Sequence, residues 1–367
     1  MIFYHAKRPL IIFGWGIHLA KAEKEARQFI HESGIPCICT WGAGDLFDHD
    51  DPLYIGTFGT HGTRAANFAL QNADVVLSIG SRLDTKATGS PAKDFAKKAK
   101  VYMVDIDQSE IDKFARLGRE ITGICQDAKV FLDTLPLYQH FVPTEWQQTV
   151  QRWKKDYPGF DPLYKVGEGI NPYEFIHNLS DYLNPDDTIV SDTGCPVGWM
   201  MQAFRFKGQR FYHGWNNTPM GYGLPGAIGA AFATNGRVVL VSGDGGLSVN
   251  ITEMATLARH QLPVKIILFN NRGHAMCRQT QRTWLNGEYP STSYEGGLAT
   301  PDYEAVADAY GIPLFHDIDS MMKAEGPGFL NLDISLDYQI VPQVKAGKSL
   351  EDAEPPLPRE ELAEIMK

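Results

Sequence analysis

Short apolar runs that alternate with helical patterns constrain the fold of this chain most strongly. Helical patterns at residues 19–33 and 61–73 separate the first runs. Apolar runs without polar alternation are typical of strands buried on both faces, and crossover helices connect such strands in parallel sheets. The alternation therefore predicts a parallel α/β domain. The runs are RPLIIF, IPCICT, DVVLSIG and KVYMVDID, at residues 8–13, 35–40, 74–80 and 100–107.

A second series of the same kind follows a change in composition. Residues 136–170 are rich in proline, aromatic and charged residues and show no strand pattern, which predicts a linker with one helix. A helical pattern at residues 171–183 then precedes four further strand patterns, at residues 187–192, 238–244, 264–270 and 328–334. With 367 residues the chain is too long for one ordinary core.

These patterns predict two three-layer α/β/α domains with mainly parallel sheets. The expected boundaries are 1–135 for a Rossmann-type first domain, 136–170 for the linker, 171–345 for the second domain and 346–367 for a C-terminal tail. The tail is rich in proline and charge. It is interpreted either as a disordered end or as a flap over a site.

Composition argues against several classes of function. A formal charge of −10 disfavours binding to nucleic acid, which depends on clustered Lys and Arg. No apolar run is long enough to cross a bilayer, so we expect no membrane insertion. The five cysteines are scattered and odd in number, which predicts a reducing, cytoplasmic setting without a disulfide framework. Cys37 and Cys39 are expected to be buried strand thiols rather than metal ligands.

Polar residues gather where two strands of the second series should end. Asp244 follows one strand, and Asn271 follows the next one after a helical pattern at residues 250–261. If a right-handed crossover makes these strands neighbours, the two side chains converge at the carboxyl edge of the sheet. Carboxylate and amide oxygens suit Mg²⁺, which completes its coordination shell with phosphate and water. A lone GDG is also typical of a tight turn, but this spacing favours a metal diphosphate site.

Residues 241–276 closely resemble the thiamine diphosphate enzymes, whose signature is GDG followed, after a helix and a strand, by NN. The resemblance implies that Mg²⁺ is bound by Asp244, by the Asn271 side chain and by the backbone carbonyl of Gly273. Gly245 and Gly246 would lie near the diphosphate, because glycines let backbone amides approach a phosphate. The other cofactor-binding residues that the resemblance implies are Thr193, Gly194, Thr218, Met220 and Gly243.

Residues 191–204 and 213–233 are similar to the two cofactor segments of the acetolactate synthase-like branch of that family. The resemblance implies that Met220 holds the cofactor in its V-shaped conformation and that Met276 borders the substrate pocket. Cys195-Pro196 stands where a Gln-His pair is common, which leaves the identity of the substrate open.

Two polar residues close to Met276 are further candidates for the substrate pocket. His274 and Arg278 either meet a substrate carboxylate or are solvated loop residues.

Residues 56–89 and 100–113 are similar to the central domain of acetolactate synthase, which binds FAD in a role without redox chemistry. Lys86 stands where an arginine is usual. Relatives that lack flavin keep this domain for folding and dimerisation, so an ADP-like ligand or an empty domain remains an alternative. The positions that the resemblance assigns to FAD are Gly59, Thr60, His61, Gly80, Arg82, Asp84, Asp105 and Ile106.

The resemblance implies a decarboxylase or carboligase, a lyase or transferase that uses thiamine diphosphate and Mg²⁺ on a 2-keto acid such as pyruvate. Branched-chain amino acid biosynthesis is one setting for such an enzyme. Family members also carry a pyrimidine-binding domain that supplies the catalytic glutamate, and no stretch of this chain resembles it. We therefore expect the chain to be incomplete by itself and to form a homo-oligomer, to bind a separate pyrimidine-domain subunit, or both.

Other functions remain open at this stage. Residues 39–56 and 278–289 resemble synthase-like proteins of bacterial surface-sugar pathways, in which an acetyl unit would join a keto sugar. A noncatalytic cofactor-binding or assembly module is the alternative from another class. A dinucleotide-dependent oxidoreductase is disfavoured, because Gly14-Trp15-Gly16 lacks the third glycine of the fingerprint.

Overall fold

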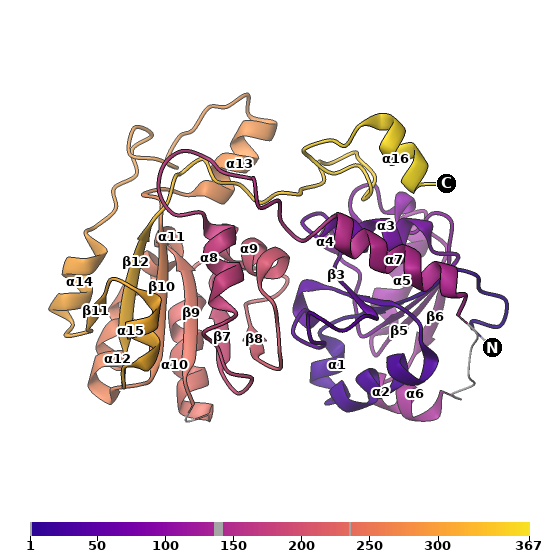
Figure 1. Cartoon of the computed structure of the whole chain (residues 1–367), viewed down its shortest axis with the longest axis horizontal. Helices are drawn as coiled ribbons and strands as arrows, with labels where there is room; N and C mark the ends of the chain where they lie inside the picture. Colours follow the sequence, from indigo (N-terminus) through magenta and orange to yellow (C-terminus); the bar gives the residue numbers. More distant parts are fainter. Residues whose placement is uncertain (1, 136–141, 235) are drawn as a thin grey trace. The chain divides into compact units, whose positions relative to one another are not determined.

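The computed structural model describes residues 2–135, 142–234 and 236–367. The chain forms two compact units, each built on a six-stranded sheet with flanking helices (Figure 1). The first unit comprises Met1–Asp161 together with Val341–Lys367, and the second comprises Pro162–Ile340. All strand pairs in both sheets are parallel. The predicted pair of parallel α/β domains is confirmed.

The first sheet has the strand order β3-β2-β1-β4-β5-β6. Its strands are β1 (Pro9–Phe13), β2 (Cys37–Cys39), β3 (Tyr54–Thr57), β4 (Val75–Ile79), β5 (Lys100–Asp105) and β6 (Thr122–Cys125). Strands are added outwards in one direction from β1 to β3 and in the other from β4 to β6, so the carboxyl ends of β1 and β4 flank the switch point at which α/β sheets bind ligands. The helices are α1 (Gly16–Leu19), α2 (Glu23–Ser33), α3 (Arg64–Asn72), α4 (Thr85–Thr88), α5 (Gln108–Arg116), α6 (Ala128–Thr134) and α7 (Thr144–Asp156), with 3₁₀ turns η1 (Trp41–Ala43) and η2 (Ala92–Asp94).

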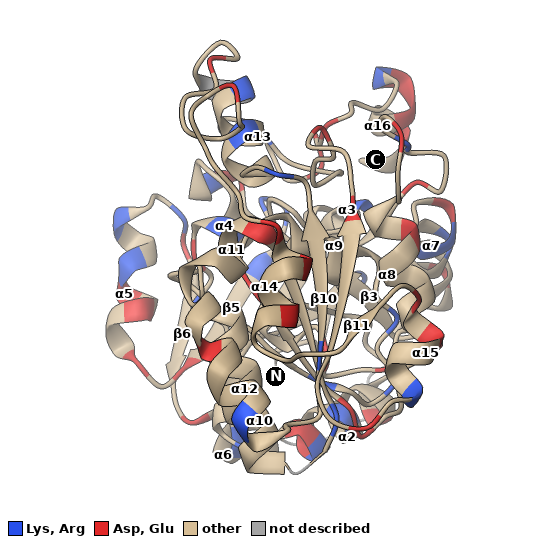
Figure 2. Cartoon of the chain, turned by 90° about the vertical axis from the view of Figure 1, so that its left-hand side faces the viewer, with Lys and Arg blue, Asp and Glu red and all other residues tan. Residues whose placement is uncertain are grey.

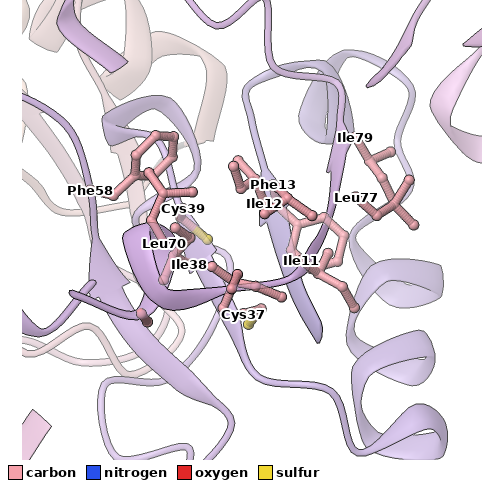
Figure 3. Close-up of a cluster of buried hydrophobic side chains, with 14 of the residues drawn as sticks. Ile11, Ile12, Phe13, Cys37, Ile38, Cys39, Phe58, Leu70, Leu77 and Ile79 are labelled. Carbon is pink, nitrogen blue, oxygen red and sulfur yellow. The ribbon is translucent and has the colours of Figure 1, made fainter. Parts of the chain in front are cut away.

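The core of the first unit forms on both faces of its central strands. All five residues of β1 are buried, and Figure 3 shows Ile11 and Phe13 among side chains from β2 and β4. Cys37 and Cys39 are completely buried in this cluster and are free thiols, as predicted. Burial raises the pKa of both thiols well above its usual range.

The helical pattern predicted over residues 19–33 is divided into two helices. The chain turns between α1 and α2 at Lys21, whose φ is +52°. The buried imidazole of His18 lies between two carboxylates, with Nδ1 at 2.8 Å from Glu23 and Nε2 at 2.9 Å from Asp45. These contacts bring the start of α2 back towards α1, which a continuous helix would not allow.

The C-terminal segment packs on the first unit from residue 341 onward. The amide of Val344 donates to the carbonyl of Thr60 at 2.7 Å, and that of Gly347 donates to the carbonyl of Ser90 at 2.8 Å. Gln71 on α3 donates to the buried carboxylate of Glu351 at 2.6 Å. The segment ends in α16 (Arg359–Ile365). The segment is therefore an ordered part of the first unit rather than a disordered end.

The first unit also includes the helix that was assigned to the linker. Trp146 of α7 is buried, and its indole nitrogen donates to the carbonyl of Pro9 at 2.9 Å. Trp153 is buried on the same helix. Because these aromatic side chains belong to the first core, the compact units divide at residues 161 and 340. The boundaries expected at 135, 170 and 345 differ from this division.

The second sheet has the order β11-β12-β10-β9-β7-β8. Its strands are β7 (Thr188–Ser191), β8 (Arg210–Tyr212), β9 (Val238–Gly243), β10 (Val264–Asn270), β11 (Leu314–Phe315) and β12 (Gly328–Asp333). Every residue of β10 is buried, which explains why its sequence is apolar apart from Lys265 and the final Asn270. The helices are α8 (Pro172–Leu179), α9 (Cys195–Ala203), α10 (Gly223–Thr234), α11 (Asp244–Val249), α12 (Met254–His260), α13 (Ala275–Trp284), α14 (Tyr303–Ala309) and α15 (Ile318–Lys323), with the 3₁₀ turn η3 (Ile251–Glu253).

Within the described parts of the chain, none of the helices combines the length and the apolar character needed to span a membrane.

Candidate functional site

Three neighbouring strands of the second unit deliver polar residues to the carboxyl edge of the sheet. Strand β9 pairs with β7 on one side and with β10 on the other. Gly243, the last residue of β9, is in register with Phe269, just before Asn270 ends β10. Asp192 directly follows β7. As predicted, the strands that lead to Asp244 and Asn271 are neighbours, and Asp192 follows a third strand beside them.

Asp244 links the two predicted metal-binding motifs. It begins α11, and only 2% of its surface is exposed. One carboxylate oxygen accepts a hydrogen bond from the amide of Gly245 at 2.9 Å, and the other accepts from the amide of Gly273 at 3.0 Å. Burial raises the pKa of this carboxyl to about 6, although these amides favour its charged form. Asp244 therefore lies against the loop that carries Asn271.

Asn271 contributes an oxygen that lacks a partner. Its side-chain Oδ1 is buried and accepts no hydrogen bond within the described part of the chain. A buried acceptor without a partner costs free energy, so such atoms usually mark a ligand, an ion or a water. Asn271 lies two residues before Gly273, whose amide binds Asp244, so a cation at this end of the sheet would satisfy the oxygen that lacks a partner.

The donor set fits Mg²⁺ rather than a softer metal. No group of three or more His, Cys, Asp and Glu side chains that could bind a metal occurs among residues 2–135, 142–234 and 236–367. A site of one carboxylate, one amide oxygen and the carbonyl of Gly273 consists of oxygens only. Magnesium uses few protein ligands of this kind and completes its octahedron with phosphate oxygens and water.

Residues 243–246, called the GDG loop below, contain glycines that leave room for neighbouring side chains. A methyl group on Gly245 would lie 2.7 Å from Nε2 of His274 and 3.2 Å from Cε of Met220. A methyl group on Gly246 would lie 2.6 Å from Cγ of Asp192. Met220 and His274 are therefore beside the GDG loop, and larger residues at these two glycines would collide with the site.

The remaining predicted cofactor residues lie on two loops of the same unit. Gly194 has a φ of +100°, and a methyl group there would lie 4.0 Å from Cβ of Met276, which is half-buried in the first turn of α13. The amide of Thr193 donates to Asp192 at 2.8 Å. Thr218 has a φ of +45°, and its amide donates to the carbonyl of Gly214 at 2.9 Å. The structure thus brings Gly194 and Met276 together.

The two candidate carboxylate-binding residues differ in their surroundings. The guanidinium of Arg278 lies over the ring of Tyr289 at 4.1 Å and pairs with Asp337 at 3.2 Å. The ring of His274 lies against the GDG loop, and burial lowers the pKa of its imidazole. His274 is therefore the member of the pair that borders the candidate cofactor site.

Sequence reasoning missed three residues that support this site. The buried Asp192 binds several backbone amides, and its place at a strand end was the only available signal. The hydroxyl groups of Tyr303 and Ser248 lie 3.0 and 2.9 Å from the carbonyl of Asp244 and 2.6 Å from each other, so one donates to the carbonyl and the other can donate to its neighbour. Tyr303 is 59 residues away in sequence, so no local pattern could indicate its contact with Asp244.

In the first unit, the glycines predicted to contact FAD pack against the chain itself. The amide of Gly16 donates to the carbonyl of Gly80 at 2.8 Å, and a methyl group on Gly80 would lie 2.9 Å from Cα of Gly16. A methyl group on Gly59 would lie 2.4 Å from the carbonyl of Lys86. Close approach of backbone to backbone therefore explains Gly59 and Gly80 without a ligand.

The polar residues predicted for FAD are also engaged within the first unit. His61 lies 3.0 Å from the side chain of Gln343, and Arg82 pairs with Glu110 at 3.1 Å. Asp84 caps α4, and Asp105 accepts a hydrogen bond from the amide of Asp107. Ile106 is 73% exposed. His61, Arg82, Asp84 and Asp105 therefore have partners within the chain, and FAD stays a prediction.

Comparisons with known proteins match both units. Residues 1–135 match the family model "thiamine pyrophosphate enzyme, central domain", and residues 192–326 match "thiamine pyrophosphate enzyme, C-terminal TPP binding domain". The chain belongs to the thiamine pyrophosphate enzyme family. The second match contains Asp192, Asp244 and Asn271, so the edge of the sheet described above lies within the family's cofactor-binding domain.

Curated relatives in this family are acetolactate synthase large subunits. The chain is 32% identical over 363 residues to the acetolactate synthase isozyme 2 large subunit of Escherichia coli (strain K12), which covers 94% of this chain and 63% of the relative. It is 31% identical over 359 residues to the acetolactate synthase large subunit of Porphyra purpurea, covering 94% and 60% respectively. The chain therefore spans about three fifths of the length of these thiamine pyrophosphate enzymes.

Proposed function

We propose that this chain binds thiamine diphosphate and Mg²⁺ as part of an acetolactate synthase-like 2-keto acid decarboxylase or carboligase. The observation that carries the proposal is the buried Oδ1 of Asn271, which lacks a partner on the loop whose Gly273 amide binds the carboxylate of Asp244. Membership in the thiamine pyrophosphate enzyme family supports the identity of the cofactor. When bound, this cofactor supplies a nucleophilic carbon that attacks the carbonyl of a 2-keto acid.

The residues of the chain would divide the work at this site. Asp244, Asn271 and the carbonyl of Gly273 hold the metal, and the metal holds the diphosphate. Met220, whose methyl group approaches Gly245, supports the ring end of the cofactor. Met276 borders the pocket for a substrate of the size of pyruvate.

We propose that the chain forms a homo-oligomer in which a second copy of the chain covers α10. The exposed residues Pro225, Gly229 and Phe232 lie on this helix, which contains no charged residue, whereas the neighbouring α12 does (Figure 2). Met220, just before α10, is 40% exposed although it borders the candidate cofactor site. An uncharged, apolar surface continuous with the site is typical of an interface. The pyrimidine-binding domain of the family, on this or another polypeptide, would supply the catalytic glutamate.

A different acceptor substrate is the second candidate. Pro196 stands where many relatives carry a polar residue, and a methyl group on Gly243 would lie 3.6 Å from its ring. An apolar ring at this place removes a hydrogen-bond donor from the edge of the pocket. This change supports a carboligase that joins an acetyl unit to another carbonyl compound, such as a keto sugar. Turnover with pyruvate alone and with added keto sugars would distinguish the two functions.

Calorimetric titration tests the cofactor proposal directly. Thiamine diphosphate should bind the chain in the presence of Mg²⁺ and should bind weakly after chelation of the metal. Absence of metal-dependent binding would refute the proposal and would favour a noncatalytic assembly module. The visible absorbance of the purified protein tests the separate prediction of FAD, because bound flavin absorbs there and thiamine diphosphate does not.

A further inference from the structure

A buried carboxylate outside the metal-binding motifs connects the separate parts of the candidate cofactor site. Asp192 is completely buried, and its amide donates to the carbonyl of Val241 on β9 at 3.0 Å. Ionised carboxylates are costly to bury unless hydrogen bonds compensate the lost hydration. The hydrogen-bond donors around Asp192 therefore show which segments this carboxylate holds.

The partners of this carboxylate are backbone amides on the loop that carries Met220. One oxygen of Asp192 accepts from Gly221 at 3.1 Å, and the other accepts from Gly223 at 2.8 Å. The amide of Thr193 gives a third bond at 2.8 Å. Gly221 directly follows Met220 and has a φ of +87°, a conformation that glycine adopts without strain. The carboxylate thus fixes the backbone immediately after the methionine.

The same carboxylate also contacts the GDG loop. A methyl group on Gly246 would lie 2.6 Å from Cγ of Asp192, and one on Gly223 would lie 2.8 Å from Oδ2. Gly223 and Gly246 therefore approach one side chain from two different segments. Charged hydrogen bonds hold the Gly221 and Gly223 side, and close packing against Gly246 positions the other segment.

We propose that Asp192 is a positioning residue that sets the Met220 loop and the GDG loop relative to each other. It holds the Met220 loop through hydrogen bonds from backbone amides and the GDG loop through packing against Gly246. Its effect on cofactor affinity rests on the proposed function, whereas its effect on the Met220 loop does not. If Asp192 has this role, its replacement should make the backbone of residues 213–224 more mobile even in the cofactor-free protein.

The test compares Asp192→Asn with a matched variant in the same sheet. The amide nitrogen of asparagine cannot accept, so Asp192→Asn loses at least one bond to the loop without leaving a cavity. Lys265→Met is the control, because Lys265 is also buried but donates to the carbonyls of Ala324 and Gly326. Both changes disturb buried polar contacts, and only the first disturbs the Met220 loop.

Hydrogen–deuterium exchange of the cofactor-free protein gives the first readout. We expect the segment 213–224 to exchange about tenfold faster in Asp192→Asn than in the wild type, and to be unchanged in Lys265→Met. Titration with thiamine diphosphate and Mg²⁺ gives the second readout, with an affinity loss of about 10- to 100-fold in Asp192→Asn alone. Unchanged exchange in a folded Asp192→Asn protein would overturn the proposal, as would equal exchange in both variants.

A second variant keeps the test decisive if Asp192→Asn does not fold. Gly223→Ala retains the carboxylate and places a methyl group 2.8 Å from Oδ2, which pushes the same contact apart. It should give the same faster exchange of residues 213–224, and unchanged exchange would overturn the proposal. Wild-type protein that fails to bind thiamine diphosphate would refute the proposed function, while the exchange result would still decide the role of Asp192.

Discussion

At the scale of single residues, the candidate site depends on buried polar atoms that are held in place by backbone amides. Asp244 accepts from two amides, and Asn271 retains an oxygen without a partner. Ser248 and Tyr303 fix the carbonyl at the start of α11. If Asp244 binds the proposed cation, its carboxylate is oriented before the cation arrives, which lowers the cost of binding.

Replacement of Asp244 tests the assignment of the metal ligand. Asp244→Asn keeps the volume of the side chain and removes the negative charge, so binding of thiamine diphosphate should lose its dependence on Mg²⁺. Calorimetric titration with and without the metal measures this change. Asp302→Asn is a matched control, since Asp302 caps α14 and asparagine caps helices equally well. Metal-dependent affinity that survives in Asp244→Asn would contradict the assignment.

The hydroxyl group of Tyr303 offers a second test at this scale. Tyr303→Phe removes one of the two hydrogen-bonded hydroxyl groups beside the carbonyl of Asp244, so the affinity for Mg²⁺ should fall by about tenfold. Tyr310→Phe, in the residue that caps the end of the same helix, should leave the affinity unchanged. Equal affinities for the two variants would show that Tyr303 only fills space.

At the scale of elements, long buried strands could be predicted from sequence and short edge strands could not. The apolar runs at β1, β4, β9 and β10 gave strands in the expected places. β6 has no fully buried residue, so its sequence shows no burial pattern. The two-residue strand β11 is too short to show a period. Burial on both faces produces the sequence signal, and an edge strand lacks it.

In the candidate site, the positions of the strand ends could be predicted from local patterns, and contacts between distant residues could not. The strand ends that carry Asp244 and Asn271 could be placed because the intervening crossover makes their strands neighbours. The expected helix over residues 250–261 is instead divided into η3 and α12, and α11 begins earlier, at Asp244. The roles of Asp192 and Tyr303 depend on contacts between distant segments, which no local pattern encodes.

The buried lysine of β10 gives a prediction about stability and pH. Burial lowers the pKa of Lys265 to about 8 in the folded chain, below the value of an exposed lysine. Between pH 8 and 10 the unfolded chain therefore binds more protons, so this group makes the folded state more stable as pH rises, by up to about 3 kcal/mol. Chemical unfolding at pH 7.5 and 9.5 should show this increase in the wild type relative to Lys265→Met. A constant difference between the two proteins would contradict the lowered pKa.

At the scale of the whole molecule, the two units share the chain unequally. The second unit is one continuous stretch, residues 162–340, and the first is made of two separate stretches. Contacts of α3 hold the returning stretch, with Arg64 and Asn72 donating to the carbonyls of Ala353 and Ile365. The stability of the first unit should therefore depend on residues near the end of the sequence.

Replacement of Glu351 tests this dependence. Its buried carboxylate accepts from Gln71 and pairs with Lys97 at 3.0 Å, so Glu351→Ala should destabilise the first unit by about 1–3 kcal/mol. Hydrogen exchange should quicken in residues 341–367 and around α3, while the sheet of the second unit is unaffected. Lys348→Ala, at a neighbouring exposed position, should have little effect. Unchanged exchange in Glu351→Ala would show that the C-terminal segment is dispensable.

Because the first unit is discontinuous, the two units do not need the same length of chain to fold. All six strands of the second sheet have been synthesised by residue 333, before any of the returning segment exists. The second unit can therefore fold in a chain that still lacks residues 341–367 of the first unit. A chain that ends at residue 340 and has left the ribosome should contain a folded second unit and a first unit whose α3 surface is exposed to water.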